Sequence, residues 1–469
     1  MFLLNRALPS RILCFFCFSL SLVAASLSSE TKSAAAETYE FRESNTDSRT
    51  FNVNSTIKVD GLLETAIKSG QSRTLKLDVE GKLQYLERRL PGKGRDAEAL
   101  RSLRYYESAT ANIDVQGQKT FARGRDKHRM IVAEGTTEGL SLHSPVGPLM
   151  PSELELLNSP GDSLPVIALL PQSEVEVGEV WTPDRWVLQS LTGLEAVLKS
   201  ELTCKLESVE NELANISFQG KIEGATVGAQ TEIAVTGKLQ FRMNGHFISH
   251  LEMEQTEKRS VGSVSPGMKV TARVNWNRTL AVGTGPLTDE ALAAIPLETK
   301  PEAKYLSFEP PWDVRLLLPR DWYVFHQTSQ VAVLRLLEKG SLIAQTNISK
   351  IPSVKPGSHT SEEQFQQDIR TSLGANLIKI LKAENLSPAD GKFIHRVTVA
   401  GKANEIPVQW IYYLCAAPSG RQISFVFTVD EKLVDQLDNR DTDLVLSLEF
   451  LEPQAPPVQA GPAEASERK

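Results

Sequence analysis

Apolar and polar residues alternate along much of the chain between residues 39 and 282. The stretch RTLKLDVEGKLQYLE places Leu75, Leu77 and Val79 on one side and charged residues on the other. The stretch TEIAVTGKLQF repeats the pattern. A period of two is typical of strands that bury one face. The pattern predicts an antiparallel, curved β-sheet or half-barrel domain over residues 39–282.

Helical patterns in this region are few. Residues 96–103 and the stretch MPSELELL predict two short helices covering the sheet, and Ser152 is expected to cap the second. Gly81 and Gly237 fall inside predicted strands. Glycine in a strand often marks a bend or a bulge, and we expect one at each position.

A change of composition follows the β-rich region. Residues 283–304 are rich in proline, alanine and charge, which predicts a linker. Beyond it, Phe365, Ile369 and Leu373 recur at a helical spacing, with Thr360 or Ser361 as the cap and Gly374 as the stop. Predicted strands surround this helix and a short one follows at residues 441–448. We therefore expect an α+β domain over residues 305–452 and a disordered tail over 453–469.

The stretch FEPPWDVRLLLPRDWYVF, at residues 308–325, concentrates aromatic and apolar side chains. It fits either an aromatic ligand site or the first two strands of the second domain. Alternation of Trp312, Val314, Leu316 and Leu318 favours the strands, with Trp322 beginning the second one. The tryptophans are expected in the core.

The second domain resembles the Mog1/PsbP-like family. The resemblance rests on LLLPRDWYV, a polar helix ending in SLG, then GKFIHRVTVAG and VQWIYYLCAAPSGRQISFVFTV in the same order. It implies an α/β/α sandwich, in which helices cover both faces of an antiparallel sheet. Members of the family bind different protein partners, so the resemblance implies a fold rather than an activity.

The first domain resembles a type of secreted bacterial β-protein that has not been characterised, through LRYYESATANIDVQG and SLPVIALLPQSEVEVGEVW. At the level of fold alone it is also similar to the open barrels of lipoprotein carriers such as LolA. That similarity implies a concave face able to hold a lipid-like ligand.

The N-terminus has the three-part pattern of a signal peptide. Arg6 and Arg11 precede an apolar run at residues 12–25, and small residues follow. The run is shorter than the roughly 20 residues that span a bilayer, although an uncleaved anchor is the alternative. We expect a signal peptide at residues 1–26, a polar leader at 27–38, and a periplasmic or secreted protein.

Signal cleavage changes the charge and the cysteine count. Loss of Arg6 and Arg11 takes the net charge from −7 to −9, which argues against a general nucleic-acid-binding protein. Cys14 and Cys17 are lost as well. Cys204 and Cys415 remain and are expected to be buried free thiols, and no cysteine cluster has metal-binding spacing.

GDSL, at residues 161–164, spells the block of a family of serine esterases. A nucleophilic serine needs a base and a group that orients the base. The chain has no Asp-x-x-His sequence and Pro165 follows the block, so a turn is favoured over a catalytic Ser163.

Two further motifs are weak candidates. His246 and His250 lie four residues apart, which on a strand separates them by roughly 13 Å, too far for one metal ion. ARGRDKHRM, at residues 122–130, would suit an anion or a lipid headgroup, but the end of a solvated hairpin is favoured.

Trp181 and Trp186 are the candidates for lining an apolar ligand cavity, with packing in the core as the alternative. Five Asn-x-Ser/Thr triplets are candidate glycosylation acceptors if the source is a eukaryote. They begin at Asn54, Asn215, Asn277, Asn347 and Asn385.

These observations predict an exported, non-enzymatic protein of the cell envelope that acts by binding a lipid-like ligand or a protein. An exported GDSL-type hydrolase using Ser163 and a purely structural envelope protein are the alternatives. No catalytic residue, cofactor, metal or nucleic-acid partner is predicted.

Overall fold

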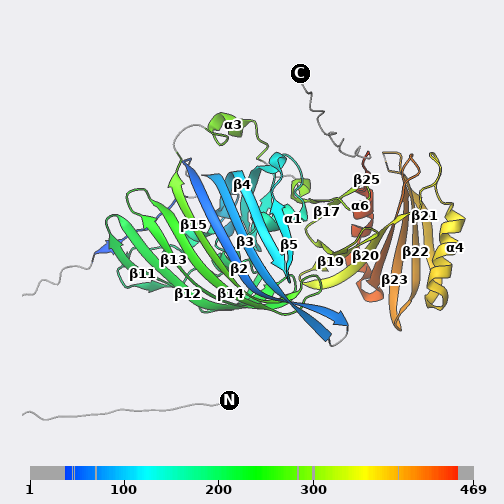
Figure 1. The fold of residues 1–469 in the computed structure, drawn as a ribbon, viewed down its shortest axis with the longest axis horizontal. Coiled ribbons are helices and arrows are strands. Elements are labelled where there is room, and N and C mark those ends of the chain that lie inside the picture. Colours follow the sequence, from blue (N-terminus) through cyan, green and yellow to red (C-terminus); the bar gives the residue numbers. More distant parts are fainter. Residues whose placement is uncertain are drawn as a thin grey trace, which may run out of the picture. The chain divides into compact units, whose positions relative to one another are not determined.

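A computed structural model describes residues 37–44, 46, 48–68, 71–281, 285–297, 301–388 and 390–452. The predicted signal peptide, most of the polar leader, parts of the predicted linker and the predicted tail lie outside the described residues. Within them the protein is β-rich, with open sheets, as the alternation predicted (Figure 1). Whether residues 39–282 and 305–452 are separate domains stays a prediction.

The larger sheet has thirteen antiparallel strands. Its main path runs β7-β6-β4-β3-β2-β15-β14-β13-β12-β11-β9, with β5 beside β4 and β10 beside β12. The strands are β2 Thr50–Lys68, β3 Gln71–Arg89, β4 Arg101–Val115, β5 Gln118–Arg123, β6 Met130–Thr136, β7 Gly139–His143, β9 Val180–Trp181, β10 Ala196–Ser200, β11 Thr203–Glu210, β12 Leu213–Thr226, β13 Ala229–Arg242, β14 Phe247–Arg259 and β15 Gly267–Leu280.

The sheet buries one face and exposes the other. Along β13, Ile233, Val235 and Leu239 are buried, whereas Ala234 and Thr236 between them are exposed. We call the side of the buried residues the inner face and the opposite side the outer face. The predicted strands therefore have the predicted polarity.

Gly237 does not mark a bulge. It pairs directly with Phe218 across β12 and β13, without a register shift at that point. A Cβ at Gly237 would lie 2.2 Å from Cζ of Phe218, so the phenyl ring occupies the space above the glycine. A Cβ at Gly81 would likewise lie close to Ile57, 2.5 Å from its Cγ2. Both glycines leave room for a neighbouring side chain. This close packing, rather than a bulge, accounts for glycine at these two strand positions.

The inner face is filled by the chain segment that follows β7. This segment contains α1 (Pro151–Leu157), the 3₁₀ helix η3 (Pro165–Leu169) and α2 (Arg185–Thr192). Leu164, Val166 and Leu169 are completely buried. The indole N–H of Trp276, on β15, donates to the carbonyl of Gly161 over 2.8 Å. The concave side of the sheet thus holds a packed core.

The second large sheet has seven strands in the order β18-β19-β20-β24-β23-β22-β21. Side chains of β23 alternate between two layers: Trp410 and Tyr412 pack with Phe365 of α4, and Tyr413 packs with Leu444 of α6. Figure 1 shows α4 and α6 on opposite sides of this sheet. The elements are β18 Trp322–Gln327, β19 Val331–Glu338, β20 Ser341–Ile351, α4 Glu362–Leu373, β21 Leu377–Leu386, β22 Phe393–Ala403, β23 Ile406–Ala416, β24 Gln422–Asp430 and α6 Arg440–Leu446.

Smaller elements complete the described chain. Strands β1 (Thr38–Tyr39) and β8 (Val175–Glu176) pair, and β16 (Leu306–Phe308), β17 (Val314–Leu318) and β25 (Glu449–Phe450) form a three-stranded sheet. The remaining elements are the helices α3 Asp289–Ala293 and α5 Val434–Leu437 and the 3₁₀ helices η1 Asp96–Ala99, η2 Asp126–His128, η4 Pro301–Lys304, η5 Gly374–Asn376 and η6 Glu431–Leu433.

Residues 308–325 contain the two predicted strands, but these do not form a hairpin, because β17 pairs with β16 and β25 whereas β18 pairs with β19 in the other sheet. Trp312, Val314, Leu316 and Leu318 are buried, and Trp322 is 2% exposed at the start of β18. Trp322 packs edge-on against Phe427 with ring centres 5.9 Å apart. Both tryptophans are core residues.

Three local predictions were wrong. Residues 96–103 form a 3₁₀ turn and then strand β4, and Ser152 lies inside α1, whose N-cap is Met150. The long strand β21 was not predicted. By contrast, Ser361 caps α4 by accepting from the N–H of Gln364, and Gly374 ends it with a φ of 50°.

Cys204 and Cys415 are free and buried in different sheets, as expected. Burial raises the pKa of Cys204 to about 12 and raises that of Cys415 further. Both thiols are therefore unreactive at neutral pH. In the described part of the chain, each helix is too short or too polar to cross a bilayer.

Candidate functional site

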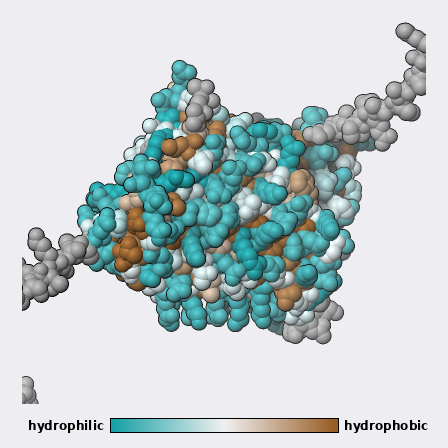
Figure 2. Space-filling view, turned by 60° about the vertical axis from the view of Figure 1, so that its left-hand side comes forward, coloured by the Kyte–Doolittle hydropathy of each residue, from teal (hydrophilic) through white to brown (hydrophobic). Residues whose placement is uncertain are grey.

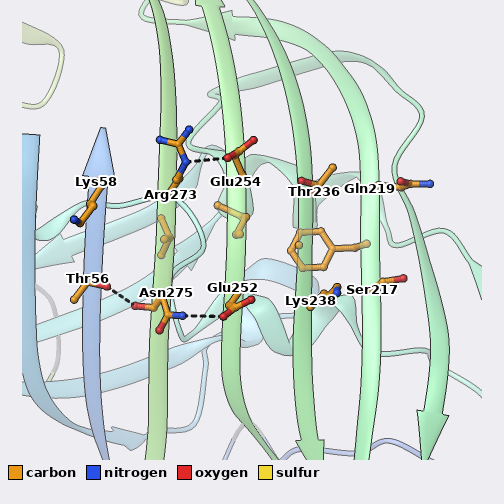
Figure 3. A pocket seen from close by; sticks show the side chains of 14 residues that line it. Thr56, Lys58, Ser217, Gln219, Thr236, Lys238, Glu252, Glu254, Arg273 and Asn275 are labelled. Atoms are coloured by element: carbon orange, nitrogen blue, oxygen red, sulfur yellow. Dashed lines mark hydrogen bonds and ion pairs between the residues drawn. The ribbon is translucent and has the colours of Figure 1, made fainter. Parts of the chain in front are cut away.

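The outer face of the larger sheet contains a hollow of about 690 Å³. It extends across β2, β15, β14, β13 and β12, and Figure 3 shows its polar side chains rising from these neighbouring strands. Ten polar residues line it: Thr56, Lys58, Ser217, Gln219, Thr236, Lys238, Glu252, Glu254, Arg273 and Asn275. We call this surface the outer hollow.

Strand register arranges these side chains in two rows across the sheet. Opposite residues of adjacent antiparallel strands share a face, about 5 Å apart. One row runs through Gln219, Thr236, Glu254, Arg273 and Lys58. The other runs through Ser217, Lys238, Glu252, Asn275 and Thr56. Residues more than 200 positions apart in sequence thereby form one surface.

Charges of both signs are paired within the outer hollow and at its edge. Arg273 contacts Asp60 at 2.5 Å and Glu254 at 2.9 Å, and Lys58 contacts Glu80 at 3.0 Å. The hydrogen bond from Lys58 lowers the pKa of Glu80, and the bond to Asp60 raises the pKa of Arg273. Glu80 and Arg273 therefore stay charged at neutral pH. They offer fixed charges and hydrogen bonds to a ligand.

A third row borders the outer hollow and is rich in amides. It runs through Asn215, Gln240, His250, Asn277 and Asn54. Gln240 donates to Asn215 over 3.2 Å, and Nδ1 of His250 lies 2.9 Å from Oδ1 of Asn277. The polar surface therefore continues past the outer hollow. On the face drawn in Figure 2, hydrophilic residues predominate and hydrophobic ones form scattered patches.

His246 and His250 do not share a strand face. His246 lies in the turn before β14 with a φ of 52°, and only His250 is on the strand. The prediction placed both on one strand, and it missed that the turn after Asn244 extends to His246. Among the described residues, no cluster of three or more His, Cys, Asp or Glu side chains is arranged to hold a metal ion.

Ser163 of the GDSL block is completely buried on the inner face. Its hydroxyl donates to the carboxylate of Glu87 over 3.0 Å, and the hydroxyl of Tyr85 lies 2.8 Å from it. Arg89 donates to the Ser163 carbonyl over 2.9 Å. The serine therefore anchors the segment of η3 to the sheet.

Ser163 belongs to a buried network of charged side chains. Arg104 bonds to Glu87 at 3.0 Å and to Asp162 through two bonds of 2.8 and 2.5 Å, while Arg278 pairs with Glu43. Burial alone would raise the pKa of Glu87, but Arg89, Arg104 and Arg278 and the Ser163 hydroxyl lower it to about 2. A carboxylate this acidic is a poor general base.

The predicted cavity residues Trp181 and Trp186 are partly buried against the core. The indole N–H of Trp181 donates to the carbonyl of Leu169 over 2.9 Å. Trp186 borders a cavity of about 540 Å³ together with Phe41, Ile167 and Leu170. Packing accounts for Trp181, and contact of either residue with a ligand stays a prediction.

The arginine-rich segment at residues 122–130 forms ion pairs. Arg123 and Arg129 share the carboxylate of Asp126, at 3.3 and 2.6 Å. Arg125 forms two bonds with Glu153 of α1, at 2.8 and 2.6 Å. Glu153 could not be identified as a partner from the sequence pattern, because it lies 28 residues from Arg125 on another element.

Sequence patterns did not single out the outer hollow. Its residues are the polar members of alternating strands, and such residues commonly do no more than face water. The signal that was available is the mixture of charged, amide and hydroxyl side chains at corresponding positions of several strands.

Comparisons with known proteins show limited structural likeness. No protein-family model and no curated protein matches the chain. The structure of cyanobacterial PsbP (CyanoP) from Synechocystis sp. PCC 6803 is 16% identical, covers 35% of this chain and 99% of its own, and has a TM-score of 0.24. The chain thus has a PsbP-like structural neighbour, with a low score.

Two other structures show likeness that is also weak. Lipovitellin, in a structure on its lipid–protein interactions, is 7% identical over 52% of this chain and 26% of its own, with a TM-score of 0.28. The translocator domain of the autotransporter NalP from Neisseria meningitidis is 7% identical over 82% and 88%, with a TM-score of 0.10. Scores this low carry no functional inference. The LolA-like analogy for the first domain is not supported.

Proposed function

We propose that this protein is exported to the cell envelope and acts there by binding another protein on the outer hollow. The observation that carries the proposal is the contrast between the two faces of the larger sheet. The inner face is packed with the protein's own side chains, such as Leu164 and Trp276. The outer face holds a hollow whose exposed side chains are polar, with buried Phe218, Met253 and Val274 also contributing to its lining.

A polar partner fits this hollow better than a lipid does. Sites for apolar ligands are concave and lined mainly by hydrophobic and aromatic side chains. The exposed side chains of the outer hollow are charged, amide or hydroxyl groups. Positive and negative side chains lie side by side in the outer hollow, which favours a protein partner whose surface carries complementary charges. Such complementarity increases the specificity and the association rate of a protein complex.

Hydrolysis by Ser163 is the weaker alternative. A nucleophilic serine has to reach its substrate and pass its proton to a base. Ser163 is completely buried, and its hydroxyl bonds to Glu87, whose pKa of about 2 suits a permanent acceptor. A purely structural role accounts for the buried network but assigns no task to the outer hollow.

Export rests on the sequence. Arg6 and Arg11 before a short apolar run form the pattern of a signal peptide. The partner is therefore sought in the envelope.

Photo-crosslinking in the cells of origin tests the proposal. A photoreactive side chain replaces Thr236, which lies in the outer hollow, and in a second variant it replaces Thr371, which is exposed on α4. We expect a protease-sensitive adduct of one defined partner from position 236 and none of that partner from position 371.

An adduct that resists protease but is degraded by glycosidases would replace the protein partner with a glycan. The same adduct from both positions, or none from position 236, would contradict binding at the outer hollow.

A further inference from the structure

A second cavity, of about 320 Å³, lies between β4, β5 and α1. It shares no lining residue with the outer hollow. Its volume is within the range of sites for small molecules. Its walls include apolar groups, guanidinium groups and one imidazole, together with carboxylates and hydroxyls.

The imidazole belongs to His128, which is 7% exposed. Its Nδ1 lies 3.0 Å from Oε2 of Glu153, and this carboxylate also receives the backbone N–H of Met150 over 2.9 Å. Burial lowers the pKa of His128, so the ring is neutral at neutral pH. A neutral ring that donates from Nδ1 to Glu153 has a lone pair on Nε2. In the described chain Nε2 has no hydrogen-bonding partner.

Three guanidinium groups border the same cavity. Arg123 and Arg129 both pair with the single carboxylate of Asp126, so their combined charge exceeds that of their partner. Arg125 is matched by Glu153. Glu107 also borders the cavity and is exposed at the bulge of β4. The side chain of Arg123 is 61% exposed, so water and salt screen both of these charges.

The apolar wall comes from Phe121, Leu149 and Leu157. Leu149 and Leu157 are buried, whereas Phe121 is 62% exposed on β5, at the edge of the cavity. An exposed aromatic ring beside buried leucines gives an apolar group a surface to cover.

We propose that this cavity binds a phosphate monoester carried on an apolar body. A phosphate monoester anion combines an O–H donor with anionic oxygens. The O–H donates to Nε2 of His128, and the anionic oxygens accept from Arg123 and Arg129, which favour phosphate. The apolar body covers Phe121, Leu149 and Leu157. A carboxylate lacks the O–H, so it satisfies the arginines but leaves Nε2 unpaired.

Calorimetry with hexyl phosphate tests this site in the full exported chain. We expect saturable binding that is at least roughly tenfold tighter than that of inorganic phosphate or hexanol, because only hexyl phosphate has both parts. Arg129→Gln and His128→Gln should each weaken it by roughly tenfold. His250→Gln, which changes an imidazole on β14, should leave it unchanged.

Thermal unfolding of each variant shows that it remains folded, and Arg129 is sufficiently exposed to be replaced without disturbing the core. Sedimentation with vesicles containing phosphatidic acid then separates the two sources of the ligand. If the protein binds the vesicles and Arg129→Gln and His128→Gln abolish this binding, the natural ligand is a lipid headgroup. If the protein binds hexyl phosphate but not the vesicles, the natural ligand is a free phosphate ester. The absence of binding to both, or equal losses in His250→Gln, would overturn the proposal.

Discussion

Single residues in this protein take roles that depend on distant partners. Ser163 sits in an esterase-like block, yet its hydroxyl bonds to Glu87, which is 76 residues away. Glu43 pairs with Arg278 across 235 positions. Sequence reasoning disfavoured a catalytic Ser163, because no Asp-x-x-His sequence supplies a base, and kept it only as an alternative. It had no means of finding the buried charges, since strand alternation alone predicts apolar residues at those inner positions.

Replacement of Glu87 should change the acid stability of the protein. Its pKa is about 2 in the folded state against an ordinary value of 4.5, so its stabilising contribution is complete above pH 4.5 and is lost as the pH falls toward 2. Glu87→Gln leaves buried guanidinium groups uncompensated and should lower the free energy of unfolding at pH 7 by about 3 kcal/mol or more.

Urea unfolding between pH 2 and pH 7 measures this effect. The variant should lose less stability than the wild type between pH 4.5 and pH 2. Glu80→Gln, at an exposed pair with Lys58, serves as the control and should change the free energy of unfolding little. Parallel pH curves for wild type and Glu87→Gln would contradict this role for Glu87.

At the scale of elements, the alternation of apolar and polar residues correctly predicted the strands that bury one regular face. It failed at β21, where Ile378 and Leu381 are 60% and 42% exposed. Two register shifts interrupt this edge strand, so its apolar residues do not keep a period of two. The helix prediction for residues 96–103 failed for a different reason, because these residues form a single 3₁₀ turn that leads into β4.

The contact between Gly237 and Phe218 supports the curved sheet beneath the outer hollow. A Cβ at position 237 would meet the phenyl ring at 2.2 Å and the carbonyl oxygen of Glu252 at 2.7 Å. We expect Gly237→Ala to cost about 1–3 kcal/mol in the free energy of unfolding, because the ring and the backbone have to move.

Gly124→Ala is the matched control, since its new Cβ would approach other atoms no closer than 3.6 Å. Denaturant unfolding compares the two variants. Gly237→Ala should cost less free energy of unfolding when it is added to Phe218→Leu than when it is added to the wild type. Equal stability of Gly237→Ala and Gly124→Ala would contradict the account of this glycine.

At the scale of the whole molecule, the β-rich class followed from the alternation of apolar and polar residues. The filling of the concave face could not be predicted from the sequence. A half-barrel pattern does not tell whether the concavity is empty or filled, because the filling segment, with Leu164, Val166 and Leu169, reads as an ordinary loop and short helices. The outer hollow required strand register, which joins residues 217 and 58 in one surface.

Exchange of charges within one ion pair tests the central claim most directly. Lys58→Glu with Glu80→Lys keeps a cross-strand pair but inverts a charge in the outer hollow. Lys258→Glu with Glu232→Lys makes the same exchange at an exposed pair outside it. Against the partner captured at position 236, the first exchange should raise the dissociation constant by roughly tenfold and the second should leave it unchanged. Equal effects of the two exchanges, or no effect of the first, would contradict binding through the outer hollow.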